Sequence, residues 1–270
     1  MGLSLSPDVP HGVGHVPQGR GRTRDRGDCP MTRSYKAIAA VVLAAAHLVP
    51  VSEARAADMD DAIYWHVQAE QLEYRAGDGD DVVAWDANAW IGNDDHRLAF
   101  KSEGENPVGK RLEKAELQFL YRRPVSTFFD VNAGIRHDLR PDPDRTYGVI
   151  GLQGLAKQFV ETDANLFLSE TGDLSARLEA EVDWRLTQRL ILQPTAEINV
   201  AFSEDRRIHS GAGINTVEAG LRLKYEIRRE FAPYVGLHYE RKVGATANFA
   251  RNEGEDTDSL RFVAGVSFWF

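Results

Sequence analysis

The chain has 270 residues, a formal net charge of −9 and a mean hydropathy of −0.39. These bulk values are those of an acidic protein with no long apolar segment, and they still allow a transmembrane β-barrel, whose lipid-facing residues are hidden in alternation. The acidic balance argues against a nucleic acid as partner, because nucleic-acid binding needs a basic surface. The single cysteine, Cys29, excludes a disulfide framework.

The N-terminal region has the pattern of a secretory signal. Residues 31–56 combine a positively charged start, an apolar core too short to span a bilayer and the A-x-A ending Ala54–Ala56. Because a signal peptide stands at a chain terminus, we expect translation to begin at Met31 and residues 1–30 to be an upstream extension. Residues 57–270 are then the mature protein, which we expect to be one domain without cysteine.

In one segment, Leu174–Leu186 (LSARLEAEVDWRL), the amino-acid composition and the spacing of apolar residues predict different secondary structures. Leu, Ala, Glu and Arg are good helix formers, so propensity alone favours a helix. Every second residue is apolar, however, and only a strand puts all of these residues on one face. The residues between them are nearly all charged, so we predict a strand with one apolar and one ionic face.

The same alternation recurs along the mature chain and predicts about twelve strands. In addition to the segment above, we predict strands at Ala62–Tyr74, Val82–Gly92, His96–Glu103, Lys114–Tyr121, Phe128–Leu139, Thr146–Leu155, Phe159–Glu170, Leu190–Phe202, Thr216–Ile227, Ala232–Glu240 and Ser259–Phe270. Most of the long acidic or glycine-rich connections fall on one side of this series, and tight turns fall on the other. That asymmetry is typical of outer-membrane barrels.

The strand ends and the last strand indicate which kind of barrel this is. The chain ends at Phe270, on the apolar face of an aromatic final strand, which is the feature that the outer-membrane assembly machinery reads. A soluble lipocalin-like or sandwich fold is the alternative, but about twelve strands with charges outside would leave a wide apolar lumen. Aromatic residues suited to a membrane interface lie near strand ends, at Trp65, Trp85, Trp184, Tyr225 and Phe231.

We therefore predict an all-β fold, a transmembrane antiparallel up-and-down β-barrel of about twelve strands, in contact with the lipid bilayer of a Gram-negative outer membrane. Its inward ionic face supplies the candidate functional residues. These charges either conduct or bind cations, or pair with one another and stiffen a narrow barrel. The predicted lumen residues are Arg177, Glu179, Glu181, Asp183, Arg185, Glu197, Glu218, Arg222, Lys224, Glu226 and Glu240.

Histidines of the mature chain are candidates for a metal site. His238 and Glu240 are two residues apart on one strand face, so they can share one metal ion. An ordinary solvated or ion-paired histidine is the alternative at each position. The sequence has no P-loop, G-x-G-x-x-G or cysteine-based metal motif, and no run like that of an outer-membrane phospholipase, so we expect no enzymatic activity.

Several stretches resemble the copper resistance protein B (CopB) family of bacterial outer-membrane proteins. They are Ala133–Ala156, Leu186–Pro194, Gly220–Gly244 and Phe262–Phe270, and the turn residues match along with the strands. The resemblance extends roughly from Trp65 to the last residue. It implies a barrel that serves copper tolerance, by binding copper ions or by helping them leave the periplasm, with a periplasmic copper-binding protein as a partner.

The chain departs from this family in two places. Many members carry a long Met/His-rich segment before the barrel, whereas the mature chain has only Met59 there, and GLAKQFV stands where the family tends to read GLAPYWF. If copper is bound, our candidate ligands are His238, Glu240, His137 and His66. A narrow general cation channel, or a structural barrel without copper binding, is the competing interpretation.

Overall fold

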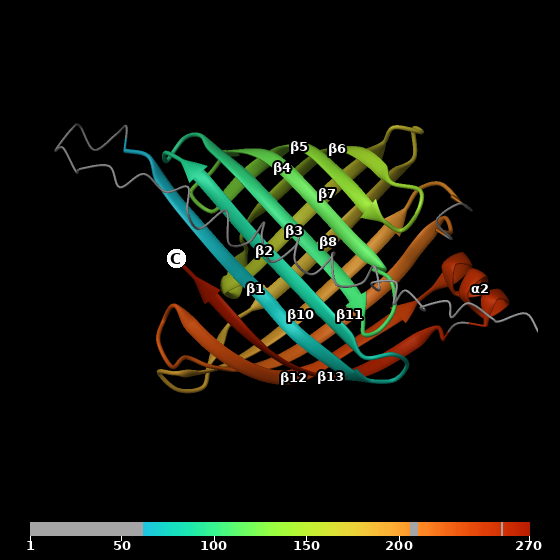
Figure 1. The fold of residues 1–270 in the computed structure, drawn as a ribbon. Helices are drawn as coiled ribbons and strands as arrows, with labels where there is room; N and C mark the ends of the chain where they lie inside the picture. The colour runs from blue at the N-terminus through green and yellow to red at the C-terminus, as the bar shows by residue number, and fades with distance from the viewer. Residues whose placement is uncertain (1–61, 206–209, 255) are drawn as a thin grey trace, which may run out of the picture. The chain divides into compact units, whose positions relative to one another are not determined.

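The computed structural model describes residues 62–205, 210–254 and 256–270. They form a closed antiparallel barrel of twelve strands (Figure 1). The strands carry thirteen labels, because one strand is divided into β8 and β9: β1 (Tyr64–Gly77), β2 (Val82–Gly92), β3 (Arg97–Pro107), β4 (Lys114–Pro124), β5 (Phe129–Arg140), β6 (Arg145–Leu155), β7 (Val160–Ser169), β8 (Leu174–Val182), β9 (Trp184–Arg185), β10 (Leu190–Ala201), β11 (Gly213–Tyr225), β12 (Phe231–Lys242) and β13 (Asp258–Trp269). Pairing of β1 with β13 and of β10 with β11 closes the sheet, which confirms the predicted fold class.

Strands β8 and β9 are one strand with a break at Asp183. Both pair with β10 in a single register, Thr195 opposite Glu181 and Leu192 opposite Trp184. Pro194 lies at the break, and proline has no N–H to donate to the ladder. The alternating segment is therefore a strand as predicted, because its pairing with β7 and β10 in the closed sheet overrides helix propensity.

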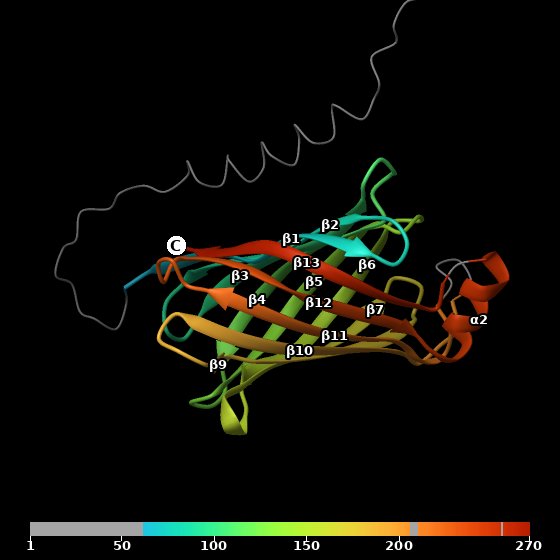
Figure 2. The same ribbon diagram turned by 90° about the horizontal axis from the view of Figure 1, so that it is seen from below.

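The two ends of the barrel differ in their connections (Figure 2). At one end, which we call the turn end, β1 begins, β13 ends, and short turns such as residues 93–96 and 186–189 join the strands. At the other, the loop end, the long connections are residues 202–212 and 243–257, the latter carrying α2 (Gly244–Glu253). A short 3₁₀ turn, η2 (Lys157–Phe159), belongs to the turn end. The predicted asymmetry of the connections is confirmed.

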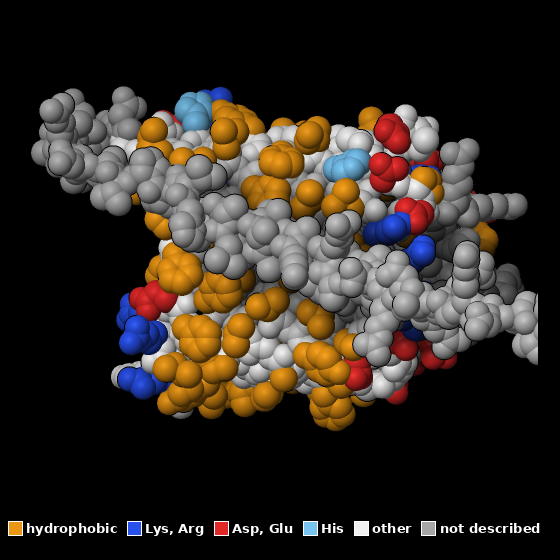
Figure 3. All heavy atoms as spheres, viewed as in Figure 1, with side chains coloured by type: hydrophobic (Ala, Val, Ile, Leu, Met, Phe, Trp, Pro, Cys, Tyr) orange, Lys and Arg blue, Asp and Glu red, His pale blue; other side chains and the backbone are white. Residues whose placement is uncertain are grey.

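The outer face of the barrel is apolar. Leu98, Phe119 and Ile135 are each more than half exposed on it, and hydrophobic side chains form a broad band between the two ends (Figure 3). A contiguous apolar surface of this extent needs a nonaqueous environment. None of the helices in the described ranges is long and apolar enough to span a bilayer.

Aromatic residues ring the turn end. Trp65, Trp184, Tyr225 and Phe231 are all exposed and lie at strand ends on that side. Trp85 is different, since it lies near the loop end of β2, paired with Gly104 of β3. A Cβ added to Gly104 would come within 2.3 Å of the Trp85 ring, so glycine makes room for it. The indole Nε1 donates to Ser102 Oγ at 3.2 Å.

The predicted upstream extension (residues 1–30) and signal peptide (residues 31–56) lie outside the described residues, as do Met31, Cys29 and Met59.

Candidate cation site in the barrel lumen

Inward-facing residues that lie directly opposite one another on neighbouring strands form rows around the lumen. One row brings together carboxylates from five successive strands of the wall, and we call it the carboxylate row: Asp163 of β7, Glu179 of β8, Glu197 of β10, Glu218 of β11 and Glu240 of β12. Like charges directly opposite each other destabilise a sheet. The row therefore requires cations nearby.

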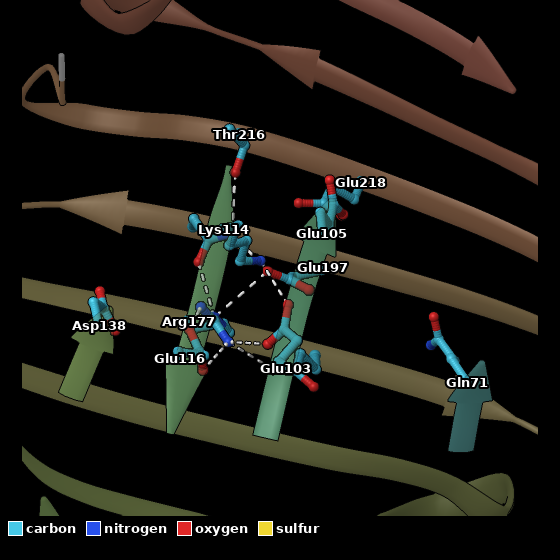
Figure 4. A network of polar contacts seen from close by, with 12 residues as sticks. Gln71, Glu103, Glu105, Lys114, Glu116, Asp138, Arg177, Glu197, Thr216 and Glu218 are labelled. Carbon is cyan, nitrogen blue, oxygen red and sulfur yellow. Dashed lines mark hydrogen bonds and ion pairs between the residues drawn. The ribbon is translucent and has the colours of Figure 1, made fainter. Parts of the chain in front are cut away.

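Protein cations meet part of this requirement. Lys101 Nζ lies 2.5 Å from Asp163 Oδ2, and Arg177 lies 3.5 Å from Glu197 and 3.9 Å from Glu179. His238 Nε2 is 3.7 Å from Glu218 Oε2, a contact that becomes an ion pair only when the imidazole is protonated. Lys114 of β4, whose Nζ lies 2.6 Å from Glu103 Oε1, adds a further positive charge near Glu197 and Glu218 (Figure 4). The ion-pair distances to Glu179 and Glu197 are at the long end for ion pairs, so compensation at the middle of the row is partial.

Arg177 also reaches across the lumen (Figure 4). Its Nη1 donates to Glu103 Oε2 at 2.9 Å and its Nη2 donates to Glu116 Oε2 at 2.9 Å. β3 and β4, which carry these carboxylates, are not neighbours of β8 in the sheet, so the contacts span the interior. The Lys101–Asp163 pair crosses from β3 to β7 in the same way. Together these ion pairs narrow the lumen.

A cavity of about 400 Å³ lies among these strands. Its charged lining is dominated by carboxylates, against the cations Arg75, Lys101 and Arg222. The lining carboxylates are Glu70, Asp86, Glu103, Glu105, Glu161, Asp163, Glu179, Glu181, Glu197 and Glu218. A hollow with this excess of negative charge and low-dielectric walls concentrates cations.

Of the charged residues predicted to face the lumen, most do so and two lie at the turn end. Those that face the lumen are Arg177, Glu179, Glu181, Asp183, Glu197, Glu218, Arg222, Lys224 and Glu240. Arg222 is fully buried and donates from Nη2 to Glu73 Oε1 at 2.9 Å. Arg185 and Glu226 instead line a groove at the turn end.

The four candidate copper ligands do not converge. His238 lies in the lumen with its Nε2 3.3 Å from Arg75 Nη1, and Glu240 follows two residues later in the carboxylate row. His66 lies at the turn end, with its ring centroid 6.1 Å from that of Trp90.

His137 is on the outward face of β5. It has the same parity as the exposed Ile135 and Leu139, and its Nδ1 is 3.0 Å from Thr146 Oγ1. Among the described residues, no group of three or more His, Cys, Asp or Glu side chains is arranged to hold a metal ion. Copper ligation by these residues stays a prediction.

The lumen residues predicted from the sequence did not include Lys101, Glu103 and Asp163. Glu103 makes one end of the cross-lumen contact of Arg177, and the other two form the second cross-lumen pair. Their strands were predicted, so the alternation in His96–Glu103 and Phe159–Glu170 could have assigned them to the lumen.

Comparison with known proteins defines the family. The family model described as "Copper resistance protein B precursor (CopB)" matches residues 63–270. The copper resistance protein B homolog of Pseudomonas syringae pv. tomato (strain ATCC BAA-871 / DC3000) is 43% identical over 211 residues, which cover 78% of this chain and 71% of that protein. Copper resistance protein B of Escherichia coli is 42% identical over 211 residues, with the same coverage of 78% and 71%.

Solved structures similar to the chain include outer-membrane porins. The NanC porin has a TM-score of 0.48 and 14% identity, covering 76% of this chain and 99% of that one. The KdgM porin in complex with disordered oligogalacturonate has a TM-score of 0.43 and 8% identity, covering 76% of this chain and 99% of that one.

The resemblance inferred from the sequence is confirmed by the family match. The chain belongs to the copper resistance protein B family, and its barrel lies in the outer membrane.

Proposed function

We propose that the barrel contributes to copper resistance by taking up Cu(II) as cargo in its acidic lumen, without catalysing a reaction. The observation that carries this proposal is the carboxylate row, in which Glu179, Glu197, Glu218 and Glu240 lie directly opposite one another with incomplete compensation. A divalent cation between these side chains would relieve their repulsion.

The ligand types favour Cu(II) over Cu(I). Residues 62–270 contain neither cysteine nor methionine, and the soft sulphur ligands that select Cu(I) are therefore missing from the barrel sequence. Carboxylate oxygens and the imidazole of His238 suit Cu(II). Without a convergent set of ligands, each ion would be held weakly, and a weak multi-site arrangement lets an ion enter and also leave.

Titration of the purified full chain in detergent tests this proposal. Isothermal titration calorimetry and Cu(II) electron paramagnetic resonance should both detect binding to the unaltered protein. The triple variant Glu179→Gln, Glu197→Gln, Glu218→Gln should weaken binding at least about tenfold, since it removes three of the five carboxylates. Heat-modifiable migration on a gel reports whether each variant is folded.

A matched control removes three exposed carboxylates outside the lumen, by Glu113→Gln, Glu170→Gln and Glu230→Gln. It should bind Cu(II) like the unaltered chain and restore copper tolerance to a deletion strain, whereas the lumen variant should not. Absence of Cu(II) binding by the unaltered chain, or equal loss in both triple variants, would contradict the proposal.

The cross-lumen ion pairs of Arg177 and Lys101 favour a second candidate, a structural barrel or narrow general cation channel that does not bind copper. Planar-bilayer recordings separate the two forms of this candidate. A general channel conducts Na⁺ and K⁺ as readily as divalent ions, whereas a structural barrel conducts neither.

We also propose two protein partners. The assembly machinery of the outer membrane would read β13, whose Phe262 and Phe270 are exposed on the outer face. A periplasmic copper-binding protein would deliver the ion at the turn end. Deletion of Phe270 should slow barrel assembly, measured as the fraction of heat-modifiable protein in outer-membrane preparations.

A further inference from the structure

A basic groove lies at the turn end, away from the carboxylate row. It runs between two neighbouring turns, residues 186–189 after β9 and residues 226–230 after β11. The turns are held side by side because β10 pairs with β11 and the Glu226 N–H donates to the Arg189 carbonyl at 2.8 Å. The groove has a volume of about 830 Å³, and its lining includes Arg185, Arg189, Glu226, Ile227, Arg228 and Arg229.

The charge of this groove is strongly positive. Four arginines face one carboxylate, Glu226, and all four arginines are exposed. Across the described ranges, none of these four side chains has an ion-pair partner within 4 Å. Lys and Arg side chains gather at this end of the barrel in Figure 3. The turn at residues 93–96 (NDDH), at the same end, is acidic instead, so the rim is not uniformly positive.

Apolar side chains border the groove on the outer face. Trp184 and Leu186 are each 55% exposed, and Ile227 is 52% exposed. Exposed tryptophan and aliphatic side chains at strand ends mark the boundary between hydrocarbon and headgroups. The arginines therefore lie just beyond the hydrocarbon, at the depth of lipid phosphates. Short turns of outer-membrane barrels face the periplasm, so this boundary belongs to the periplasmic leaflet.

We propose that this groove binds the phosphate of an anionic phospholipid of the periplasmic leaflet. Guanidinium groups bind phosphate oxygens in bidentate geometry, and the exposed apolar side chains beside them accept the acyl chains. An acidic protein would match the charge of the groove equally well. The lipid is favoured because the groove adjoins the lipid-facing band and not an isolated polar surface. This site is independent of copper uptake in the lumen.

Spin-label lipid selectivity tests the proposal. The full chain is placed in phosphatidylcholine bilayers, and the association of spin-labelled phosphatidylglycerol is compared with that of spin-labelled phosphatidylethanolamine. The unaltered chain should prefer phosphatidylglycerol. The double variant Arg228→Gln, Arg229→Gln should lower that preference by about fivefold or more, because each basic residue near a membrane surface contributes about fivefold in affinity.

The matched control is Arg123→Gln with Lys157→Gln, which removes two exposed positive charges at the same end, one near the end of β4 and one in η2. It should keep the preference for phosphatidylglycerol. Equal loss in both double variants, or no preference in the unaltered chain, would overturn the proposal. Binding of soluble polyglutamate by the unaltered chain without lipid selectivity would also overturn it, in favour of an acidic protein partner.

Discussion

Two rows of inward residues in this barrel have the same geometry and opposite chemistry. One is the carboxylate row. The other, which we call the apolar row, contains Trp90, Ala99, Leu120, Val149 and Phe167, with Gly134 between Leu120 and Val149. Each row takes one residue from each successive strand. The apolar row fills its part of the lumen with side chains that are mostly buried, whereas all members of the carboxylate row except Glu240 line a cavity.

The comparison teaches that alternation assigns a residue to the lumen without saying whether the lumen is filled there. Apolar side chains gain by packing together and excluding water. Carboxylates repel one another and keep space for water or cations between them. Arg177 links the two regions, because its guanidinium carbon lies 5.7 Å from the Phe167 ring centroid while its Nε lies 3.5 Å from Glu197 of the carboxylate row. Its other nitrogens contact Glu103 and Glu116 across the lumen.

Breaking the link between the rows should have the largest effect. Arg177→Gln leaves Glu103 and Glu116 without their shared partner, and breaking a buried ion pair destabilises by about 3–5 kcal/mol. We expect about 3 kcal/mol, at the lower end, because Arg136 still lies 2.8 Å from Glu116. Urea unfolding in lipid vesicles, followed by tryptophan fluorescence, measures the loss. As a control, the exposed Arg123→Gln should change the free energy of unfolding by less than about 0.5 kcal/mol. An equal loss in both variants would show that the contacts of Arg177 do not stabilise the barrel.

Opening a cavity in the apolar row should have the next largest effect. Leu120 is 3% exposed, and Leu→Ala at buried positions costs about 2–5 kcal/mol. We expect Leu120→Ala to cost about 2 kcal/mol, because its cluster is small. The same unfolding assay measures the change. Leu98→Ala on the lipid face should cost less, since lipid refills the space. A cost for Leu98→Ala as large as that of Leu120→Ala would contradict packing in the apolar row.

Neutralising the middle of the carboxylate row should change stability in the opposite direction. Glu218 lies directly opposite both Glu197 and Glu240, so Glu218→Gln removes two repulsive pairs. We expect the free energy of unfolding to rise by about 0.2–1 kcal/mol, while Cu(II) binding weakens. If Glu218→Gln instead destabilises the barrel, cations of the protein already neutralise the row. The carboxylates would then not repel one another as we infer.

The end of the carboxylate row should show the smallest effect. Glu240 lies opposite Glu218 on one side and Ser259 on the other, so Glu240→Gln removes only one repulsive pair. The expected stabilisation is about half that of Glu218→Gln and stays below about 0.5 kcal/mol. Chemical unfolding of the two variants side by side provides the check. A larger gain at Glu240 than at Glu218 would mean that charges outside the row dominate.

The sequence by itself determined the strands, their two faces and the kind of barrel. Alternation in Leu174–Arg185 was enough to override helix propensity, because a period of two has only one structural solution. Alternation also assigned individual side chains to one face of the sheet. The parity of His137 with Ile135 already places it on the outward face, which argues against a lumen site that includes all four candidate ligands.

Only the tertiary structure decided which inward residues meet. Arg177 is 74 residues from Glu103 and 61 residues from Glu116, and no local pattern relates them. Register between strands and closure of the sheet set these distances, because a shift of any strand by two residues keeps every side chain on its face and changes every partner. For that reason the carboxylate row, the cross-lumen ion pairs and the basic groove emerge from the fold, although each of their residues is plain in the sequence.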